Sequence, residues 1–206
     1  MDAIRTLTEE HRVILQVVDA LEACATRVER EQRVERADVA RFETFFREFT
    51  DVCHHGKEED ILFAALADSG FPTATGPLAV MRADHDRGRR LVRRIRELAE
   101  KPEQWEAADF EAFAGAAHAF AALLRDHIRR EDEVLYPMAE EHLSRAQLRQ
   151  VDELFQLFEE QREKGLVHAR LHELAEALIR RYGSVDAQHR PAAGDRMRPV
   201  PSCCGF

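Results

Sequence analysis

The sequence predicts an all-α protein, an antiparallel up-down bundle of four helices with an additional C-terminal helix. Apolar residues recur at steps of three and four, which is the helical period, and no segment alternates apolar and polar residues as a half-buried strand would. Only nine of the 206 residues are glycine, and most of these stand between the periodic stretches. Long helices joined by short connections are typical of antiparallel bundles.

The first two helices are predicted from their cap residues and apolar stripes. Thr6 and Glu9 have the spacing of a capping box, so we expect the first helix to start near Leu7. We expect the second helix to start at about Asp38, a residue type that caps helices well, and to continue to about Ala67. A Ser-Gly-Phe-Pro segment follows and ends it.

Prolines mark the bounds of the third and fourth helices. Pro77 suits the first turn of the third helix, because the N–H that proline lacks has no partner there in any helix. The Lys101-Pro102 pair ends this helix, and we expect the fourth to run from about Asp109 to about Glu141.

A fifth helix follows, and after it the composition changes. Ser144 and Gln147 again have the spacing of a capping box, so we expect a helix that reaches Tyr182. We expect residues 1–182 to form one helical unit. Residues 183–206 contain three prolines and few large apolar groups, and we expect them to form a mobile tail.

Composition and charge exclude several classes of function. The formal net charge of −9 gives no reason to bind nucleic acid, since phosphates favour a clustered positive surface. No apolar run approaches the roughly 18 to 20 residues of a membrane-spanning helix, and the first ten residues lack the apolar core of a secretory signal. The four cysteines, two of them adjacent at Cys203 and Cys204, lack the pattern of a disulfide framework. We therefore expect a cytoplasmic protein with no nucleic-acid or membrane partner.

An internal repeat places histidine and glutamate at matched positions. Residues 52–63 align without a gap on residues 125–136, and the matched pairs are His54 with His127, Glu58 with Glu131, and Phe63 with Tyr136. Upstream of each copy stands an acid–histidine pair, Glu10-His11 or Asp84-His85, and the two histidines of a copy are 43 or 42 residues apart. The chain therefore uses one helical hairpin twice.

The repeated residues favour a metal site. Residues four apart lie on one face of a helix, so the histidine and glutamate of each His-x-x-x-Glu motif can reach a common point. A single buried histidine is explained more simply by a hydrogen bond to the backbone. Four imidazoles and two carboxylates inside one bundle are harder to satisfy this way, because buried carboxylates without partners are costly. Imidazole with carboxylate suits iron, manganese or zinc, and two equivalent sets predict two ions bridged by Glu58 and Glu131.

These motifs resemble those of the hemerythrin-like HHE cation-binding family, in particular a bacterial subgroup. In that pattern each His-x-x-x-Glu motif is followed by Leu-Phe or Leu-Tyr-Pro, and here by Leu62-Phe63 and by Leu135-Tyr136-Pro137. The resemblance covers about residues 1–182. It implies a non-haem di-iron centre, two iron ions with an oxo or hydroxo bridge, in a four-helix bundle. Carried over residue by residue, its metal ligands are His11, His54, Glu58, His85, His127 and Glu131.

The second helix offers two adjacent histidines. Its helical phase favours His55 and Glu59 for the interior, whereas the repeat favours His54 and Glu58. We follow the repeat, because a local bulge in the helix would reset the phase. His55 is kept as an additional ligand or as a residue that supports one.

The chain departs from the oxygen carriers of the family at one position. Those proteins place a fifth histidine four residues after the histidine of the third helix, and this chain has Arg89 there. The fifth histidine is therefore missing or supplied from elsewhere. His168 and His172, four apart in the fifth helix, resemble a motif of the bacterial subgroup and are weaker candidates for metal binding.

Three functions remain open from the sequence. The first is a cytoplasmic di-iron protein that binds O2, peroxide or nitric oxide for sensing or detoxification. It is favoured because two protein carboxylates stabilise high-valent iron less than the Glu-rich set of ferritin-like oxidases. The second is an iron-handling or iron-sensing module, and the third is a helical bundle without metal. No motif indicates an electron-transfer partner, so catalytic turnover is not predicted.

Overall fold

The computed structural model describes residues 2–163 and 167–183, and within them all regular structure is helical. The all-α prediction is confirmed. The predicted tail, with Cys203 and Cys204, lies outside the described residues apart from Gly183. The helices, with π-helical segments labelled η, are α1 (Ala3–Glu31), α2 (Arg36–Phe45), η1 (Phe46–His55), η2 (Glu58–Leu62), α3 (Phe63–Asp68), α4 (Gly76–Glu100), α5 (Ala107–Arg130), η3 (Glu131–Leu135), α6 (Tyr136–His142), α7 (Arg145–Glu163) and α8 (Val167–Tyr182).

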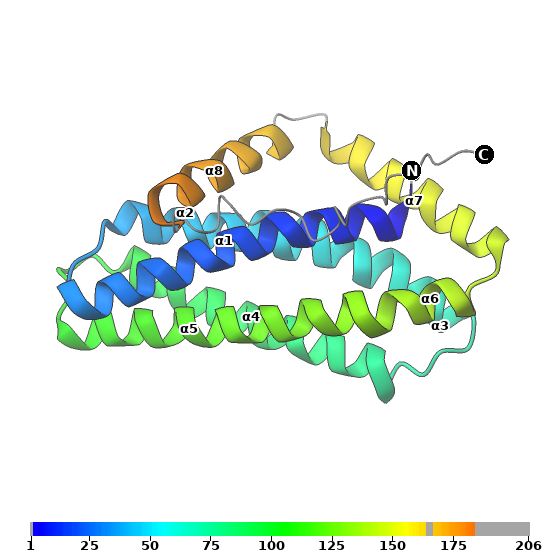
Figure 1. Cartoon of the computed structure of the whole chain (residues 1–206), viewed down its shortest axis with the longest axis horizontal. Coiled ribbons are helices and arrows are strands. Elements are labelled where there is room, and N and C mark those ends of the chain that lie inside the picture. The colour runs from blue at the N-terminus through cyan, green and yellow to red at the C-terminus, as the bar shows by residue number, and fades with distance from the viewer. Residues whose placement is uncertain (1, 164–166, 184–206) are drawn as a thin grey trace, which may run out of the picture.

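The long helices contact one another in a closed ring. α1 lies along α5, α5 along α4, and α4 along α2, while η1 returns to α1 (Figure 1). α8 covers α1 and α2, and α7 packs on η2 and on α1 (Figure 1). The expected single fifth helix is therefore wrong. Gly165 lies between α7 and α8 in the sequence, and glycine is unfavourable inside a helix.

Two residues that were expected to cap helices do not do so. Asp2 caps α1 by accepting the Arg5 N–H at 3.0 Å, so the helix begins one turn earlier than expected. Asp38 lies inside α2 and is buried, where it pairs with Arg181 of α8 at 2.9 Å and accepts a hydrogen bond from Tyr182 at 2.6 Å. Asp38 therefore holds α8 in place instead of capping a helix.

The other helix bounds agree with their sequence signals. Pro77 lies in the first turn of α4. The Ser144 N–H donates to Gln147 Oε1 at 3.0 Å and the Gln147 N–H donates to Ser144 Oγ at 3.3 Å, which is the predicted capping box.

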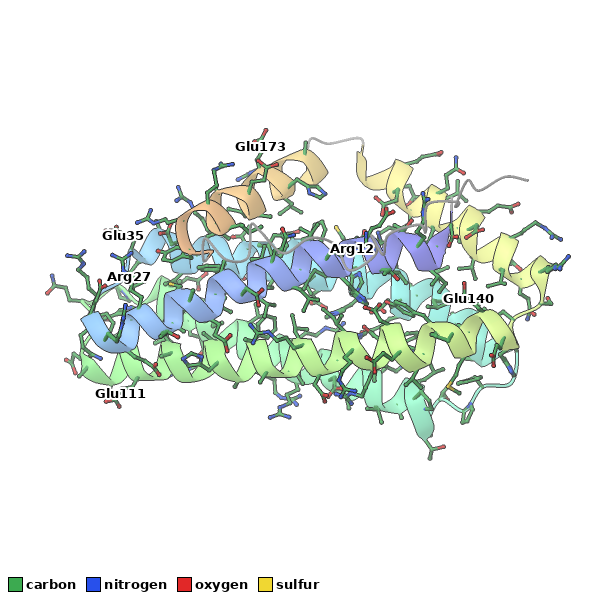
Figure 2. The ribbon with its side chains drawn as sticks, viewed as in Figure 1. Arg12, Arg27, Glu35, Glu111, Glu140 and Glu173 are labelled. Carbon is green, nitrogen blue, oxygen red and sulfur yellow. The ribbon has the colours of Figure 1, made fainter. Side chains whose placement is uncertain are left out.

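Buried apolar side chains form two clusters, and a buried polar layer separates them. Along α1 the smaller cluster holds Leu7 and the larger begins at Ile14, with His11 between them. Along α4 the order is Met81, His85 and Val92. In contrast, the charged side chains labelled in Figure 2 face solvent (Arg12, Arg27, Glu35, Glu111, Glu140 and Glu173). Most of the buried charged side chains among the described residues therefore lie at this layer, and the exceptions are Asp38 and Glu43 of α2.

The π-helical segments all occur at or next to this polar layer. η2 and η3 begin at Glu58 and Glu131, which are equivalent positions of the repeat, and η1 ends at His55. A π-helical turn is wider than an α-helical turn, so it shifts the phase of the residues that follow it. This is the bulge expected in the second helix, and it buries His54, His55 and Glu58 together.

One helical stretch, residues 107–142, is long and apolar enough to cross a membrane by length and composition alone. Its mean hydropathy reaches 1.2 over the best window, of which 44% is buried in the fold. The expectation that no run approaches this length was wrong by that criterion, because alanine, leucine and phenylalanine are dense there. The same residues supply the packing face of α5 toward α1 and α4, as a core helix requires.

Candidate metal centre

The polar layer contains two groups of side chains that could hold a cation. In each group, one ligand atom per residue lies within 4.8 Å of all the others, and every member is buried. The first group is His11, His54, Glu58 and Glu131, and the second is His55, Glu58, His85 and His127. The structure therefore brings together all six residues of the predicted ligand set and adds His55.

The Nε2 atoms of the histidines converge on the two glutamates. Nε2 of His11 lies 2.9 Å from Nε2 of His54, and Nε2 of His85 lies 3.1 Å from Nε2 of His127. Glu131 reaches both pairs, with one oxygen 3.3 Å from His11 and the other 3.1 Å from His127. Oε2 of Glu58 lies 3.8 Å from Nε2 of His54 and 3.3 Å from Nε2 of His85. Both carboxylates are therefore shared between the two groups.

Each of the five histidines has a carboxylate beside its outer nitrogen, Nδ1. The pairs and distances are His11–Asp132 at 2.8 Å, His54–Glu10 at 2.9 Å, His55–Asp51 at 3.4 Å, His85–Glu59 at 2.6 Å and His127–Asp84 at 3.8 Å. A carboxylate at Nδ1 favours the tautomer that carries its proton there and leaves the Nε2 lone pair facing inward. Metal-binding histidines are held in this way in most proteins.

The glutamates at the centre lack hydrogen-bond donors. One oxygen of Glu58 and both oxygens of Glu131 are fully buried and accept no hydrogen bond. Buried anionic oxygens without donors are costly, and coordination to a cation is a usual way to satisfy them. The donor set of imidazole nitrogens and carboxylate oxygens therefore fits a pair of borderline divalent metal ions.

Without a metal, protons on two histidines offset the two glutamates. Burial lowers the pKa of His11, but its contacts with Asp132, Glu131 and Glu58 outweigh burial and raise the pKa to about 10. The pKa of His85 is likewise raised well above 6.5 against the effect of burial, by glutamates 131, 58 and 59. The pKa of His55 is lowered well below 6.5 by burial and by the neighbouring charge of His85.

Tyr136 is a residue of the site that sequence reasoning did not assign. Its hydroxyl donates to Glu58 at 2.7 Å, and its ring stacks on His11 with centroids 5.5 Å apart. Its repeat partner Phe63 stacks on His85 with centroids 5.9 Å apart and has no hydroxyl. The repeat alignment paired these two aromatics, and that pairing was the available signal.

Arg89, at the position of departure from the oxygen carriers, supports the group that contains His55. Its guanidinium donates to Asp51 at 2.8 Å and to Glu59 at 2.7 Å. Asp51 in turn faces His55, and Glu59 faces His85. The fifth histidine near the glutamates is thus His55 of η1. Arg89 holds Asp51 and Glu59, the carboxylates that face His55 and His85.

His172 is not brought to either group. His172 is half-buried, and its ring lies edge-on to Phe49 with centroids 5.5 Å apart. Its neighbours in α8, Leu171 and Ala175, belong to the larger apolar cluster. The interpretation of His172 as a metal ligand is therefore not supported, and the side chain of His168 lies outside the described residues.

Comparison with known proteins agrees with this geometry. The family model for the hemerythrin HHE cation binding domain matches residues 2–139. Iron-sulfur cluster repair proteins YtfE from Salmonella paratyphi B, Salmonella newport and Salmonella heidelberg are 32% identical over 88 residues. That match covers 42% of this chain and 40% of each relative, so less than half of the relatives' length is represented. No solved structure matches the chain. Since the matched family covers more than half of the residues and contains the whole polar layer, the chain belongs to the hemerythrin HHE cation-binding domain family.

Proposed function

We propose that this chain is a non-haem di-iron protein that binds O2, peroxide or nitric oxide for sensing or detoxification. The observation that carries the proposal is the pair of shared glutamates, which are buried beside five imidazoles and have three of their four oxygens without a hydrogen-bond donor. One iron would be held by His11 and His54, and the other by His55, His85 and His127. Glu58 and Glu131 would bridge the two. Bound iron would supply redox chemistry and reversible ligand binding at this level of the fold.

The protein's own groups define where a small ligand would enter this centre. The two-histidine half has one imidazole fewer than its neighbour, so it has room for an added ligand. The Tyr136 hydroxyl lies 3.3 Å from Nε2 of His11 and is fully buried, so it is the nearest proton donor to that position. We infer that Tyr136 orients the bound ligand and keeps Glu58 in place.

We infer that the scaffold is an antiparallel four-helix bundle. The four members are α1, the run from α2 to α3, α4, and the run from α5 to α6. The closed ring of contacts supports this arrangement, as do the short connections at residues 32–35, 69–75 and 101–106. A cytoplasmic location is part of the proposal and is supported by the buried free cysteine Cys24, since thiols outside disulfides persist in reducing compartments.

A second candidate function is iron handling, including the supply of iron to damaged clusters. The name of the Salmonella relatives, iron-sulfur cluster repair protein, supports this candidate. Iron handling requires the same metal centre, but the bound iron must then leave the protein and pass to an acceptor. A bundle without metal is disfavoured, because three buried carboxylate oxygens of Glu58 and Glu131 would then lack a hydrogen-bond donor.

Metal analysis of protein from iron-supplied cells tests the proposal. We expect about two iron atoms per chain, one for each imidazole group, and absorption in the near ultraviolet from a bridged ferric pair. Zinc alone, or no metal after anaerobic reconstitution with ferrous iron, would contradict it. Adding an apo iron–sulfur protein to the loaded chain separates the two candidates, since transfer of iron is expected only for the second.

A further inference from the structure

Lys57 is an unusual residue because its ammonium group is entirely buried. Its side chain is 0% exposed and lies between the carboxylates of Glu10, from α1, and Glu159, from α7. The ring of Phe155, also from α7, lies 5.9 Å from Nζ. A buried ammonium is stable only when it is paired and hydrogen-bonded, so Lys57 requires these partners.

Glu10 connects Lys57 to the metal centre. One of its oxygens accepts from Lys57, and the other faces Nδ1 of His54 at 2.9 Å. The contacts therefore run from Glu159 through Lys57 and Glu10 to His54. This chain of contacts begins on α7, which lies beyond the last residue matched by the family model.

The second repeat has the same arrangement without a partner from α7. Arg130 occupies the position of Lys57 and pairs at 2.9 Å with Asp84, which faces His127. Its other partner, Asp126 at 2.9 Å, comes from its own helix, and the Arg130 side chain is 29% exposed. Full burial and a partner from α7 are therefore particular to Lys57.

α7 is fixed against the same region by further contacts. The ring of Phe158 lies directly over Gly56, where an added Cβ atom would lie 3.4 Å from it. Asp152 accepts the N–H of Ala3 at 2.8 Å. Since Glu159 is next to Phe158, the docking of α7 places its carboxylate on Lys57.

We propose that Glu159 is a positioning residue for the metal centre, which orients His54 through Lys57 and Glu10 and so couples the docking of α7 to metal retention. The inference rests on the proposed metal centre. Without Glu159, Lys57 has only Glu10 to balance its charge. Lys57 then draws the Glu10 carboxylate away from Nδ1 of His54. Coupling between two equilibria is reciprocal, so metal loading in turn stabilises the docked position of α7.

The test compares Glu159→Gln with Glu160→Gln in iron-loaded protein. Glu160 is exposed on the same helix and, among the described residues, accepts a hydrogen bond from Gln156 one turn earlier, so it is a matched control. We expect iron to pass to an excess of a ferrous chelator roughly tenfold faster from Glu159→Gln, as for other partners of ligand histidines. We expect no change for Glu160→Gln. Equal rates for all three proteins would overturn the inference.

Phe158→Ala separates positioning from a simple loss of packing. This variant loosens α7 but leaves Glu159, Lys57 and Glu10 intact. Hydrogen exchange of the α7 amides measures docking, and the visible bands of the Co2+-loaded protein report the ligand field at the histidines. Since docking and metal retention are coupled, we expect Phe158→Ala to increase both amide exchange and metal release, with unchanged Co2+ bands. We expect Glu159→Gln to shift the bands.

Two outcomes distinguish the failure of this inference from failure of the metal centre. Identical Co2+ bands and metal loss in Phe158→Ala and Glu159→Gln would show that α7 acts only by packing and would overturn the positioning role. Wild-type protein that binds neither iron nor Co2+ would overturn the metal centre itself and the inference with it.

Discussion

The two halves of the metal centre are copies of one plan that differ at a few positions. In each half, an acid on the first helix faces the histidine of the second, and a cation at residue 57 or 130 pairs with that acid. The acid that follows each shared glutamate, Glu59 or Asp132, faces the histidine of the opposite half. The two copies differ at two matched pairs, His55 with Ile128 and Phe63 with Tyr136. One half of the centre therefore has a third imidazole, from His55, and the other has a buried hydroxyl, from Tyr136.

The surroundings of the halves also differ. The two-histidine half is covered by α7, through Lys57 and Phe158. The three-histidine half lies beside a cavity of about 250 Å3 with His55 in its wall, lined also by Phe46, Thr50, Gly88, Arg89 and Arg93 among others. An internal repeat can thus fix where the ligands lie, while single substitutions and an added helix decide what each half is exposed to.

The largest expected effect comes from removing a residue that the halves share. Glu58→Ala should abolish binding of both ions, because the carboxylate lies close to imidazoles of both groups. Glu59→Ala is the control, since Glu59 faces only Nδ1 of His85 and Arg89, and should retain most of the metal. Metal content by elemental analysis checks both. Full retention of iron by Glu58→Ala would mean that the halves do not share this ligand.

Removing one histidine from each half should affect the two-histidine half more. His54→Ala leaves one imidazole in its group, whereas His55→Ala leaves two in the other. We therefore expect His54→Ala to lose one ion per chain and His55→Ala to bind both ions with reduced affinity. Titration with ferrous iron under anaerobic conditions measures the number of ions and their affinity. The reverse order would show that His55 is the dominant ligand and that the comparison of the repeats misleads.

Removing the metal from the intact protein should destabilise both halves together. Binding to the native state alone adds stability of about 4 kcal/mol at a thousandfold excess over Kd. We expect the chelated protein to melt several degrees lower. We also expect faster amide exchange in residues 52–63 and 125–136. Equal melting and exchange with metal loss confirmed would show that the histidines are structural. Faster exchange in one segment alone would show that the halves unfold separately.

Making the aromatics of the two halves alike should have a moderate effect. Tyr136→Phe removes the only hydrogen bond made to Glu58 by the described residues and should cost about 1 to 3 kcal/mol. It should also change the absorption of the loaded centre. Phe63→Tyr is the mirror change and places a hydroxyl near His85. Chemical denaturation of chelated and loaded protein measures the free energy of unfolding, and an unchanged value for Tyr136→Phe would contradict the role of its hydroxyl.

The smallest effect is a pH dependence that is opposite for His11 and His55, one histidine from each group. In metal-free protein the pKa of His11 is raised from 6.5 to about 10, so the folded state binds more protons than the unfolded state above pH 6.5. Its contribution to stability is complete below pH 6.5 and is lost as the pH rises toward 10. The pKa of His55 is lowered instead, so it costs stability only below pH 6.5.

Melting curves at several pH values check these signs. Chelated protein should melt at lower temperature as the pH rises from 6.5 to about 10, and metal-loaded protein should not, because metal displaces the proton of His11. A melting temperature of the chelated protein that rises over this range would contradict the assigned protonation.

The fold and most of the site could be predicted because both repeat in the sequence. The period of the apolar residues gave the helices, and the match of His54 with His127 identified the ligand set. The break between α7 and α8 was missed, although residues 159–165 contain no apolar side chain and include Gly165. His55 was predicted only as an additional ligand or a supporting residue, since an ideal α-helix cannot direct His54, His55 and Glu58 to one level, and π-helical turns have no simple sequence pattern. Tyr136 and Lys57 were missed because their partners are distant in sequence.

The π-helical turns also decide how far the two copies of the hairpin are alike. η2 and η3 begin at equivalent residues, so this turn places Glu58 and Glu131 in the same way in both copies. η1 has no counterpart before η3, and it ends at His55, which Ile128 replaces in the second copy. One widened segment and one substitution are therefore enough to make two half-sites of the same plan unequal.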